Sequence, residues 1–361
     1  MARTLHILIQ NRPDTPTNPG GDTVQMERTA QFLRELGHRV DISFDLAPDL
    51  RQYDVVHLFN LTRPVETHIQ ALNAKRQGKP YVLSSVYWDL DAAVPWSAYE
   101  FPRNVWRRVV PSSLRRMARQ IRGGGAAPVD EPVLQAEIIR DAIVILPNSN
   151  AEKQHLLDRF PSVPADRFVV VLNGIDPPNS ANDVQSSSFP EVAGAFVCAG
   201  AIGPRKNQLN LVRAFRELPD ERLIIIGNPS PGSDRYLRAV RKASTTNVTF
   251  RPAVDHSMML AALREAKALV QPSYIETPGL SAMEAAALGL PVVVSDVAPV
   301  REYFGDLAHY CDPSSPASIA DGCKAAVASA PKDGREFTSK HRWPRALSEL
   351  KTVFDHIRSS D

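Results

Sequence analysis

Buried-strand patterns alternate with helix patterns along almost the whole chain, and this alternation limits the fold more than any other feature. The strand candidates, for example residues 5–10 and 55–59, are mostly Val, Ile and Leu and do not alternate between apolar and polar residues. Such runs are typical of strands that are covered on both faces. Strands that alternate with helices favour parallel sheets, so the sequence predicts a doubly wound α/β architecture.

One segment, residues 176–191, interrupts this rhythm with three prolines and three consecutive serines. This composition predicts a linker between domains, and a chain of 361 residues is long enough for two. We therefore expect a Rossmann-like domain over residues 1–180 and a second over residues 181–341. Residues 342–361 are expected to form a terminal helix, for which packing back on the N-terminal domain is one arrangement.

Composition excludes several classes of protein. Lys and Arg number 42 against 40 Asp and Glu, so bulk charge does not indicate a nucleic-acid partner. The three cysteines are far apart in the sequence, which favours a reducing compartment over a disulfide framework or a zinc site. The sequence shows neither a secretion-signal pattern nor an apolar run long enough for a bilayer span. We therefore expect a cytoplasmic protein.

An insertion at about residues 89–130 departs from the α/β pattern. It combines Trp96 and Trp106 with seven arginines, and no acidic residue occurs from position 101 to 129. Arginine and tryptophan suit an anionic membrane surface, so residues 96–122 are a candidate for contact with the inner face of the plasma membrane. A solvated basic face and a site for an anionic acceptor are the alternatives.

The most informative stretch is residues 271–291, in which a strand is followed by a short loop and a helix. Glu276 lies in the loop, Gly279 at the expected helix start, and Glu284 one turn further on. The first-turn N–H groups of Leu280 and Ser281 are free to bind an anion. Two carboxylates around an anion site suit a nucleotide sugar, which has a diphosphate at its centre and hydroxyls at both ends. The alternative is a capped helix with two solvated glutamates.

Two further loops could approach the same anion. Arg205 and Lys206 follow a strand and precede a helix, where a bound anion would offset the unfavourable placement of a lysine at a helix start. Gly20 and Gly21 open the first helix and could approach a phosphate from the other domain. The alternatives are a solvated helix start for the first loop and an ordinary turn for the second.

In the order and spacing of these motifs the sequence resembles glycosyltransferase family 4, the retaining enzymes with the GT-B fold. The resemblance rests on the pair Glu276 and Glu284, on residues 205–208 and 173–176, and on Gly20-Gly21. It is strong over residues 196–312 and weak in the N-terminal half. Residues 302–306 and 310–313 are similar to the continuation seen in bacterial surface-polysaccharide members.

The resemblance implies a role for each motif. Lys206, assisted by Arg205 and the backbone of residues 279–281, would neutralise the donor diphosphate. Glu284 would hold the ribose hydroxyls, and Glu276 would contact the donor sugar. Gly20 and Gly21 would meet the phosphates and the acceptor. Neither a metal nor a cofactor is expected, because a cation and a helix start stabilise the leaving phosphate.

Two departures from the family pattern concern catalysis. Where many members carry an arginine ahead of the motif lysine, this chain has Ala201. Where many carry a histidine after an N-terminal strand, it has Asp89, which is a candidate catalytic contact or a structural cap. His57 and Asn60 follow a similar strand and could line the acceptor cleft or satisfy hydrogen bonds near the core.

The function expected from these residues is transfer of a hexose, with mannose as one candidate, from GDP-mannose or a UDP-sugar. The acceptor would be a hydroxyl of a polysaccharide or a lipid-linked glycan. A nucleotide-sugar epimerase or phosphorylase of the same fold is the enzymatic alternative. The other alternative is a non-catalytic nucleotide-sugar-binding protein.

Overall fold

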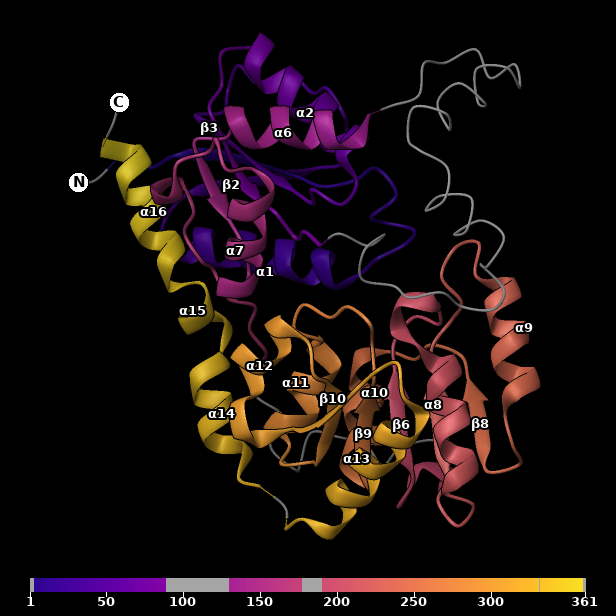
Figure 1. Ribbon diagram of the computed structural model, residues 1–361. Coiled ribbons are helices and arrows are strands. Elements are labelled where there is room, and N and C mark those ends of the chain that lie inside the picture. Colours follow the sequence, from indigo (N-terminus) through magenta and orange to yellow (C-terminus); the bar gives the residue numbers. More distant parts are fainter. Residues whose placement is uncertain (1–2, 89–129, 177–189, 331, 360–361) are drawn as a thin grey trace, which may run out of the picture.

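The computed structural model describes residues 3–88, 130–176, 190–330 and 332–359. Within these ranges the chain forms two lobes, each built on a parallel sheet with helices packed against it (Figure 1). Every strand pair in both sheets is parallel. The expected α/β architecture with two Rossmann-like sheets is confirmed.

Among the described residues, the first sheet has five strands in the order β2-β1-β3-β4-β5. Its strands are β1 (His6–Gln10), β2 (Arg39–Ser43), β3 (Val55–Phe59), β4 (Tyr81–Ser84) and β5 (Val144–Leu146). The accompanying helices are α1 (Gly21–Glu35), α2 (Pro64–Arg76), α6 (Glu131–Asp141) and α7 (Asn150–Arg159). β3 and β4 are buried along their whole length, as expected for strands covered by helices on both faces.

In the part of the chain that the structure describes, the second sheet has six strands in the order β11-β10-β9-β6-β7-β8. Its strands are β6 (Phe196–Ala199), β7 (Leu223–Ile226), β8 (Val248–Arg251), β9 (Ala268–Gln271), β10 (Val292–Ser295) and β11 (His309–Cys311). The accompanying helices are α8 (Gln208–Ala214), α9 (Asp234–Ala243), α10 (His256–Glu265), α11 (Leu280–Ala287), α12 (Ala298–Phe304) and α13 (Pro316–Ala328).

The last three helices connect the two lobes. They are α14 (Gly334–His341), α15 (Trp343–Ala346) and α16 (Ser348–Ser359), and they run along one side of the molecule (Figure 1). Phe337 of α14 belongs to the core of the second lobe, whereas Trp343, Leu350 and Phe354 belong to a core shared with β1 and β3. The end of the described chain therefore completes the N-terminal lobe.

Strand order locates where each sheet can bind a ligand. In a doubly wound sheet the ligand crevice lies beyond the carboxyl ends of the strands, where the strand order reverses. In the N-terminal sheet this position lies between β1 and β3, and in the C-terminal sheet it lies between β6 and β9. The loops that carry Gly20, Lys206 and Glu276 all begin at these strand ends.

Local contacts set the start of α1 and the segment after β5. The first helix begins at Gly21, and Thr23 Oγ1 accepts the backbone N–H of Gly20 from inside the first turn. Phe168 forms an isolated parallel bridge with Ile145 of β5. The neighbouring β5 is only three residues long, so it offers too little edge for a longer ladder.

Candidate functional site

Lys206 and Glu276 meet at the position where the C-terminal sheet reverses its strand order. Lys206 follows β6 and Glu276 follows β9, and the Lys206 Nζ lies 2.5 Å from the Glu276 Oε2. Both side chains are mostly buried, with 16% and 12% of their areas exposed. A lysine ammonium has three N–H donors. The ion pair uses one of them, so two remain for other oxygen atoms.

The loop before α8 holds Lys206 in place through backbone contacts. Residues Pro204–Lys206 form a 3₁₀ turn that ends at Asn207, whose φ of 59° is left-handed. The Asn207 amide donates to the backbone oxygens of Pro272 and Pro313, at 2.9 and 2.6 Å. The Tyr274 N–H donates to the Arg205 carbonyl at 2.9 Å. These bonds fasten the Lys206 loop to the Glu276 loop, and the Arg205 side chain extends into solvent.

The Glu276 carboxylate is further held by two neighbours that sequence analysis missed. Gln271 Nε2 and Ser273 Oγ donate to its Oε2 at 2.6 and 2.9 Å. Burial alone would raise the pKa of Glu276, but the charges of Lys206 and Arg205 outweigh it and leave this pKa below its usual value. Glu276 is therefore an anion at neutral pH. Gln271 ends the otherwise apolar strand β9, and Ser273 follows it. Polar residues at this position in the sequence were the signal that could have predicted both contacts.

The start of α11 forms one wall of the same site. Gly279 has a φ of +92°, and a Cβ there would lie 2.9 Å from the Glu276 Cγ. Glycine thus allows the turn into α11 and leaves room for the carboxylate side chain. Ser281 Oγ donates to Gln271 Oε1 at 3.1 Å, which ties the first turn of α11 to β9. Leu280 and Ser281 are each partly exposed.

Glu284 lies on α11, one turn beyond Ser281. Its Oε1 lies 2.7 Å from the Nε2 of His256, the first residue of α10. The Glu284 side chain is 18% exposed and the His256 side chain 59%. The hydrogen bond to Glu284 raises the pKa of His256 above its ordinary value, against the effect of partial burial. His256 lies outside the motifs identified in the sequence.

A network of charges orders the Gly20-Gly21 loop at the carboxyl edge of the N-terminal sheet. Asp22, in the first turn of α1, accepts hydrogen bonds from Arg12 Nε at 3.0 Å and from Asn60 Nδ2 at 3.2 Å. Burial raises the pKa of Asp22, but the bonds from Arg12 and Asn60 outweigh it and lower the net value. Asn60 therefore stabilises this loop through its hydrogen bond to Asp22.

The two sheet edges face each other. A Cβ on Gly21 would lie 4.0 Å from Leu280 Cδ1. The first turn of α1 thus meets the first turn of α11 across the domain junction. The structure brings together Lys206, Arg205, Glu276, Gly279, Leu280 and Ser281, with Glu284 one turn away and the loop of Gly20 and Gly21 opposite.

Two further candidates, Asp89 and the segment 96–122, lie outside the described residues. His57 is fully buried within β3, where its Nε2 lies 2.9 Å from Ser84 Oγ, and burial lowers its pKa to about 3. His57 is therefore a core residue, and the interpretation that it lines the acceptor cleft was wrong.

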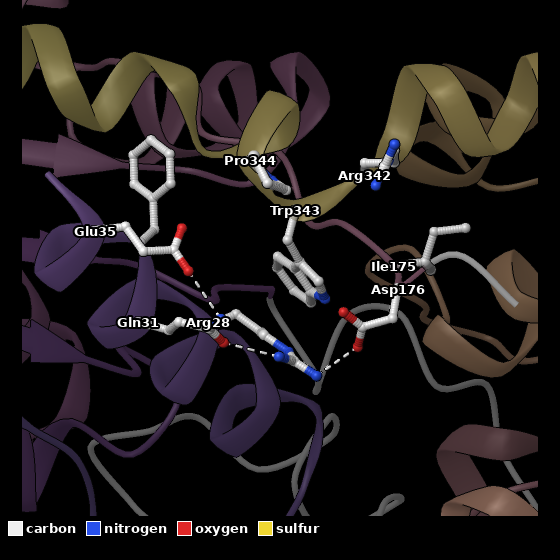
Figure 2. Close-up of a pocket in the computed structure, with 9 residues that line it drawn as sticks. Arg28, Gln31, Glu35, Ile175, Asp176, Arg342, Trp343 and Pro344 are labelled. Atoms are coloured by element: carbon white, nitrogen blue, oxygen red, sulfur yellow. Dashed lines mark hydrogen bonds and ion pairs between the residues drawn. The ribbon is translucent and has the colours of Figure 1, made fainter. Parts of the chain in front are cut away.

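A separate cavity of about 160 Å³ lies at the domain junction, between α1, α15 and the chain at Asp176 (Figure 2). Arg28 reaches from α1 to Asp176, and their Nη2 and Oδ2 atoms are 2.5 Å apart. Trp343 and Arg342 complete the wall (Figure 2). Ligand pockets have volumes of about 300–1,000 Å³, so this cavity is too small for a nucleotide sugar, and it contains none of the predicted site residues.

Within the described residues no three His, Cys, Asp or Glu side chains come together as a possible metal site. In the same part of the chain, no helix has both the length and the apolar character for a membrane span.

Residues 179–340 match the family model described as "Glycosyl transferases group 1". The D-inositol 3-phosphate glycosyltransferase of Mycolicibacterium smegmatis is 28% identical over 288 residues, which cover 74% of this chain and 59% of that protein. The protein of the same name from Jonesia denitrificans is 30% identical over 250 residues, which cover 62% and 57% of the two chains. The chain thus spans less than two thirds of the length of these relatives.

Solved structures resemble the whole chain. Sucrose-phosphate synthase from Thermosynechococcus elongatus superposes with a TM-score of 0.73 at 16% identity and covers 99% of this chain and 100% of its own. Anabaena HepE, solved in complex with UDP-glucose, gives a TM-score of 0.71 at 15% identity, with 98% and 100% covered. The expected GT-B fold is therefore confirmed.

The chain is thus similar to group 1 glycosyl transferases over residues 179–340, and its fold is similar to that of the GT-B structures. The matched region, residues 179–340, contains Lys206, Glu276 and Glu284. The two relatives are both named as D-inositol 3-phosphate glycosyltransferases. The resemblance to the bacterial surface-polysaccharide members is therefore not confirmed.

Proposed function

We propose that this chain is a retaining glycosyltransferase that transfers a hexose from a nucleotide diphosphate sugar to a hydroxyl group of an acceptor. One observation carries the proposal. The Lys206–Glu276 pair and the first turn of α11 converge beyond the carboxyl ends of β6 and β9, where a doubly wound sheet binds its ligand. The match of residues 179–340 to group 1 glycosyl transferases supports it.

The reaction breaks the bond between the anomeric carbon and the diphosphate oxygen, so negative charge develops on the leaving nucleotide. Lys206 has two N–H donors for that charge beyond the one that it gives to Glu276. The backbone N–H groups of Leu280 and Ser281 add the partial positive charge of a helix start. Groups that are already oriented toward developing charge stabilise it without reorganisation.

The carboxylates would distinguish the two ends of the donor. Glu276, held by Lys206, Gln271 and Ser273, would contact the hexose hydroxyls. Glu284, one turn along α11, would accept the ribose hydroxyls. Gly20 and Gly21 would meet the phosphates and acceptor from the opposite lobe, since the first turns of α1 and α11 lie against each other.

The names of similar proteins suggest which substrates to test first. UDP-glucose occupies a solved structure of the same fold, so UDP-sugars are the first donors to try, and GDP-mannose is the second. The relatives are named for D-inositol 3-phosphate, which makes an inositol phosphate the first acceptor. The polysaccharide or lipid-linked acceptor expected from the sequence is the second.

The proposal is tested by measuring donor binding and hexose transfer for Lys206→Ala and Glu284→Ala. Both variants should remain folded and lose at least about tenfold in kcat/KM, which corresponds to about 1.4 kcal/mol. Lys324→Ala and Glu217→Ala, on the surface of the same lobe, are the matched controls. Activity at the level of the controls in both site variants would reject the assignment.

The same assay separates the proposal from its rivals. A transferase releases nucleoside diphosphate in proportion to acceptor, and product NMR should show that the anomeric configuration of the donor is retained. An epimerase changes the donor without acceptor, and a non-catalytic protein binds it without turnover. Because Lys206 and the α11 start neutralise the diphosphate, transfer should continue at the same rate in EDTA.

Membrane contact through residues 96–122 is a separate part of the proposal, supported by the seven arginines and two tryptophans of the insertion. Flotation with vesicles that contain anionic lipid should recover the protein, and flotation with neutral vesicles should recover less. Equal, negligible recovery with both kinds of vesicle would contradict this part alone.

A further inference from the structure

The Glu284 carboxylate depends on a histidine that belongs to none of the sequence motifs. His256 begins α10, and its imidazole Nε2 lies 2.7 Å from Glu284 Oε1. The two residues are 28 positions apart in the sequence and come together because α10 packs beside α11. Among the described residues, the Glu284 carboxylate has no other hydrogen-bond partner.

This single contact matters because α11 fixes the backbone of Glu284 but not its side chain. Ala285 and Ala286 are buried against the core, so the helix itself is held firmly. The glutamate side chain still has several rotatable bonds, and fixing such a side chain on binding costs on the order of 1 kcal/mol. A partner that already holds one carboxylate oxygen removes part of that cost.

The surroundings of His256 favour this contact. Glu284 faces it from α11, Asp176 from the chain between the lobes, and Arg28 from α1. The hydrogen bond to Glu284 is the main cause of the raised pKa of His256. Asp176 adds to the effect, whereas partial burial and Arg28 oppose it. Whether protonated or neutral, the imidazole can donate a hydrogen bond from Nε2 to Glu284 Oε1. The other carboxylate oxygen, Oε2, then remains available for a ligand.

We propose that His256 is a positioning residue that holds the Glu284 carboxylate in the orientation that accepts the ribose hydroxyls of the bound nucleotide. The inference rests on the proposed function, because it gives Glu284 the role of the ribose ligand. His256 acts through Oε1 and leaves Oε2 to the ribose. Its contribution should therefore appear only with ligands that carry ribose hydroxyls.

The test measures dissociation constants by calorimetry for three probes: UDP, its dideoxy analogue whose ribose lacks both hydroxyls, and inorganic pyrophosphate. GDP replaces UDP if it binds more tightly to the wild type. His256→Ala should weaken UDP binding about fivefold, as expected for the loss of a partly exposed hydrogen bond to a charged group. Binding of the dideoxy analogue and of pyrophosphate should stay within twofold of the wild-type values.

His256→Gln is the rescue variant, because the Gln Nε2 reaches about as far as the histidine Nε2 and also donates. It should restore UDP binding to within about twofold of the wild type. Unchanged or tighter UDP binding in His256→Ala would overturn the inference. Equal weakening of all three probes, or no rescue by glutamine, would also overturn it, because a general structural effect would explain the result.

Glu284→Ala separates failure of the inference from failure of the proposed function. If Glu284→Ala weakens UDP binding and His256→Ala does not, only the inference fails. If neither UDP nor GDP binds to the wild type, or if Glu284→Ala binds UDP as the wild type does, the proposed function fails and the inference fails with it. In the Glu284→Ala background, adding His256→Ala should change nothing further.

Discussion

At the scale of single residues, the site depends on a few backbone positions and buried contacts that admit few alternatives. Gly279 combines a left-handed backbone with close contact to Glu276. Lys206 and Glu276 sit in a buried ion pair that Gln271 and Ser273 complete. Removing one partner of a buried ion pair leaves an uncompensated charge in the interior. Substitution therefore destabilises the protein more at a buried pair than at an exposed pair.

Gly279→Ala should reduce both stability and transfer. An alanine in the left-handed region costs about 1–2 kcal/mol, and here the new Cβ would also meet the Glu276 Cγ at 2.9 Å. Gly232→Ala is the matched control, because Gly232 has a φ of +74° with open space around it. Chemical denaturation should show a loss for both variants, and kcat/KM should fall only for Gly279→Ala. Equal activity in the two would show that the contact with Glu276 is unimportant.

His57→Phe should make the free energy of unfolding depend less steeply on pH below neutrality. Burial lowers the pKa of His57 from its ordinary value of 6.5 to about 3. As pH falls below 6.5, the unfolded chain therefore takes up a proton that the folded protein excludes, and stability is lost. His57 alone contributes a slope of about 1.4 kcal/mol per pH unit.

The measurement for His57 is the free energy of unfolding between pH 5 and pH 7. Wild type should lose stability with falling pH more steeply than His57→Phe, although the variant also loses the hydrogen bond to Ser84 at every pH. The comparison of slopes is therefore more informative than the absolute values. Parallel slopes would mean that His57 is protonated in the folded protein.

At the scale of elements, α12 fastens the C-terminal lobe to the N-terminal lobe. Glu302 accepts the backbone N–H groups of Asn150 and Ala151 at the start of α7, a favourable place for a carboxylate. The neighbouring Tyr303 hydroxyl donates to the Asn148 carbonyl at 2.6 Å and accepts the Asn173 N–H at 2.9 Å. One short helix thus binds two segments of the opposite lobe.

Tyr303→Phe should weaken this junction. The change leaves the buried N–H of Asn173 without its partner, at a cost of about 1–3 kcal/mol. Amide hydrogen exchange around residues 148 and 173 should accelerate. Tyr310→Phe is the matched control, since its hydroxyl bonds only within the C-terminal lobe, to the Gly305 carbonyl. Equal exchange in both variants would argue against a junction role for Tyr303.

At the scale of the whole molecule, the described chain returns from the second lobe to the first near Arg342, and this return completes the first lobe. At that point Ile175 and Arg342 form a parallel bridge. Gly174 is required there, because a Cβ would lie 2.7 Å from the Trp343 Cα. Beyond this bridge, α15 and α16 add their apolar side chains to the core of β1 and β3.

Phe354→Ala should therefore destabilise the N-terminal lobe, although Phe354 is near the end of the chain. Removing a fully buried phenylalanine costs about 3–5 kcal/mol. Hydrogen exchange should accelerate in β1 and β3 and stay unchanged in β6 and β9. Phe337→Ala, in the core of the C-terminal lobe, should produce the opposite pattern. Acceleration in both sheets by either variant would mean that the lobes unfold as one unit.

The sequence by itself determined what local physics controls. Continuous apolar runs predicted strands covered on both faces, and Gly279 with its neighbours predicted the loop and helix that carry Glu276 and Glu284. These features depend on residues close together in the chain. The group 1 match covers the same half in which the motifs are densest.

Only the tertiary structure decided which distant residues meet. Lys206 and Glu276 are 70 positions apart, and strand order brings β6 beside β9. The contact of His256 with Glu284, the burial of His57, and the return of α16 to the first lobe likewise depend on helix packing. A local pattern shows which face of an element is apolar, but it carries no information on which other element covers that face, because that choice is made by the packing of the whole chain.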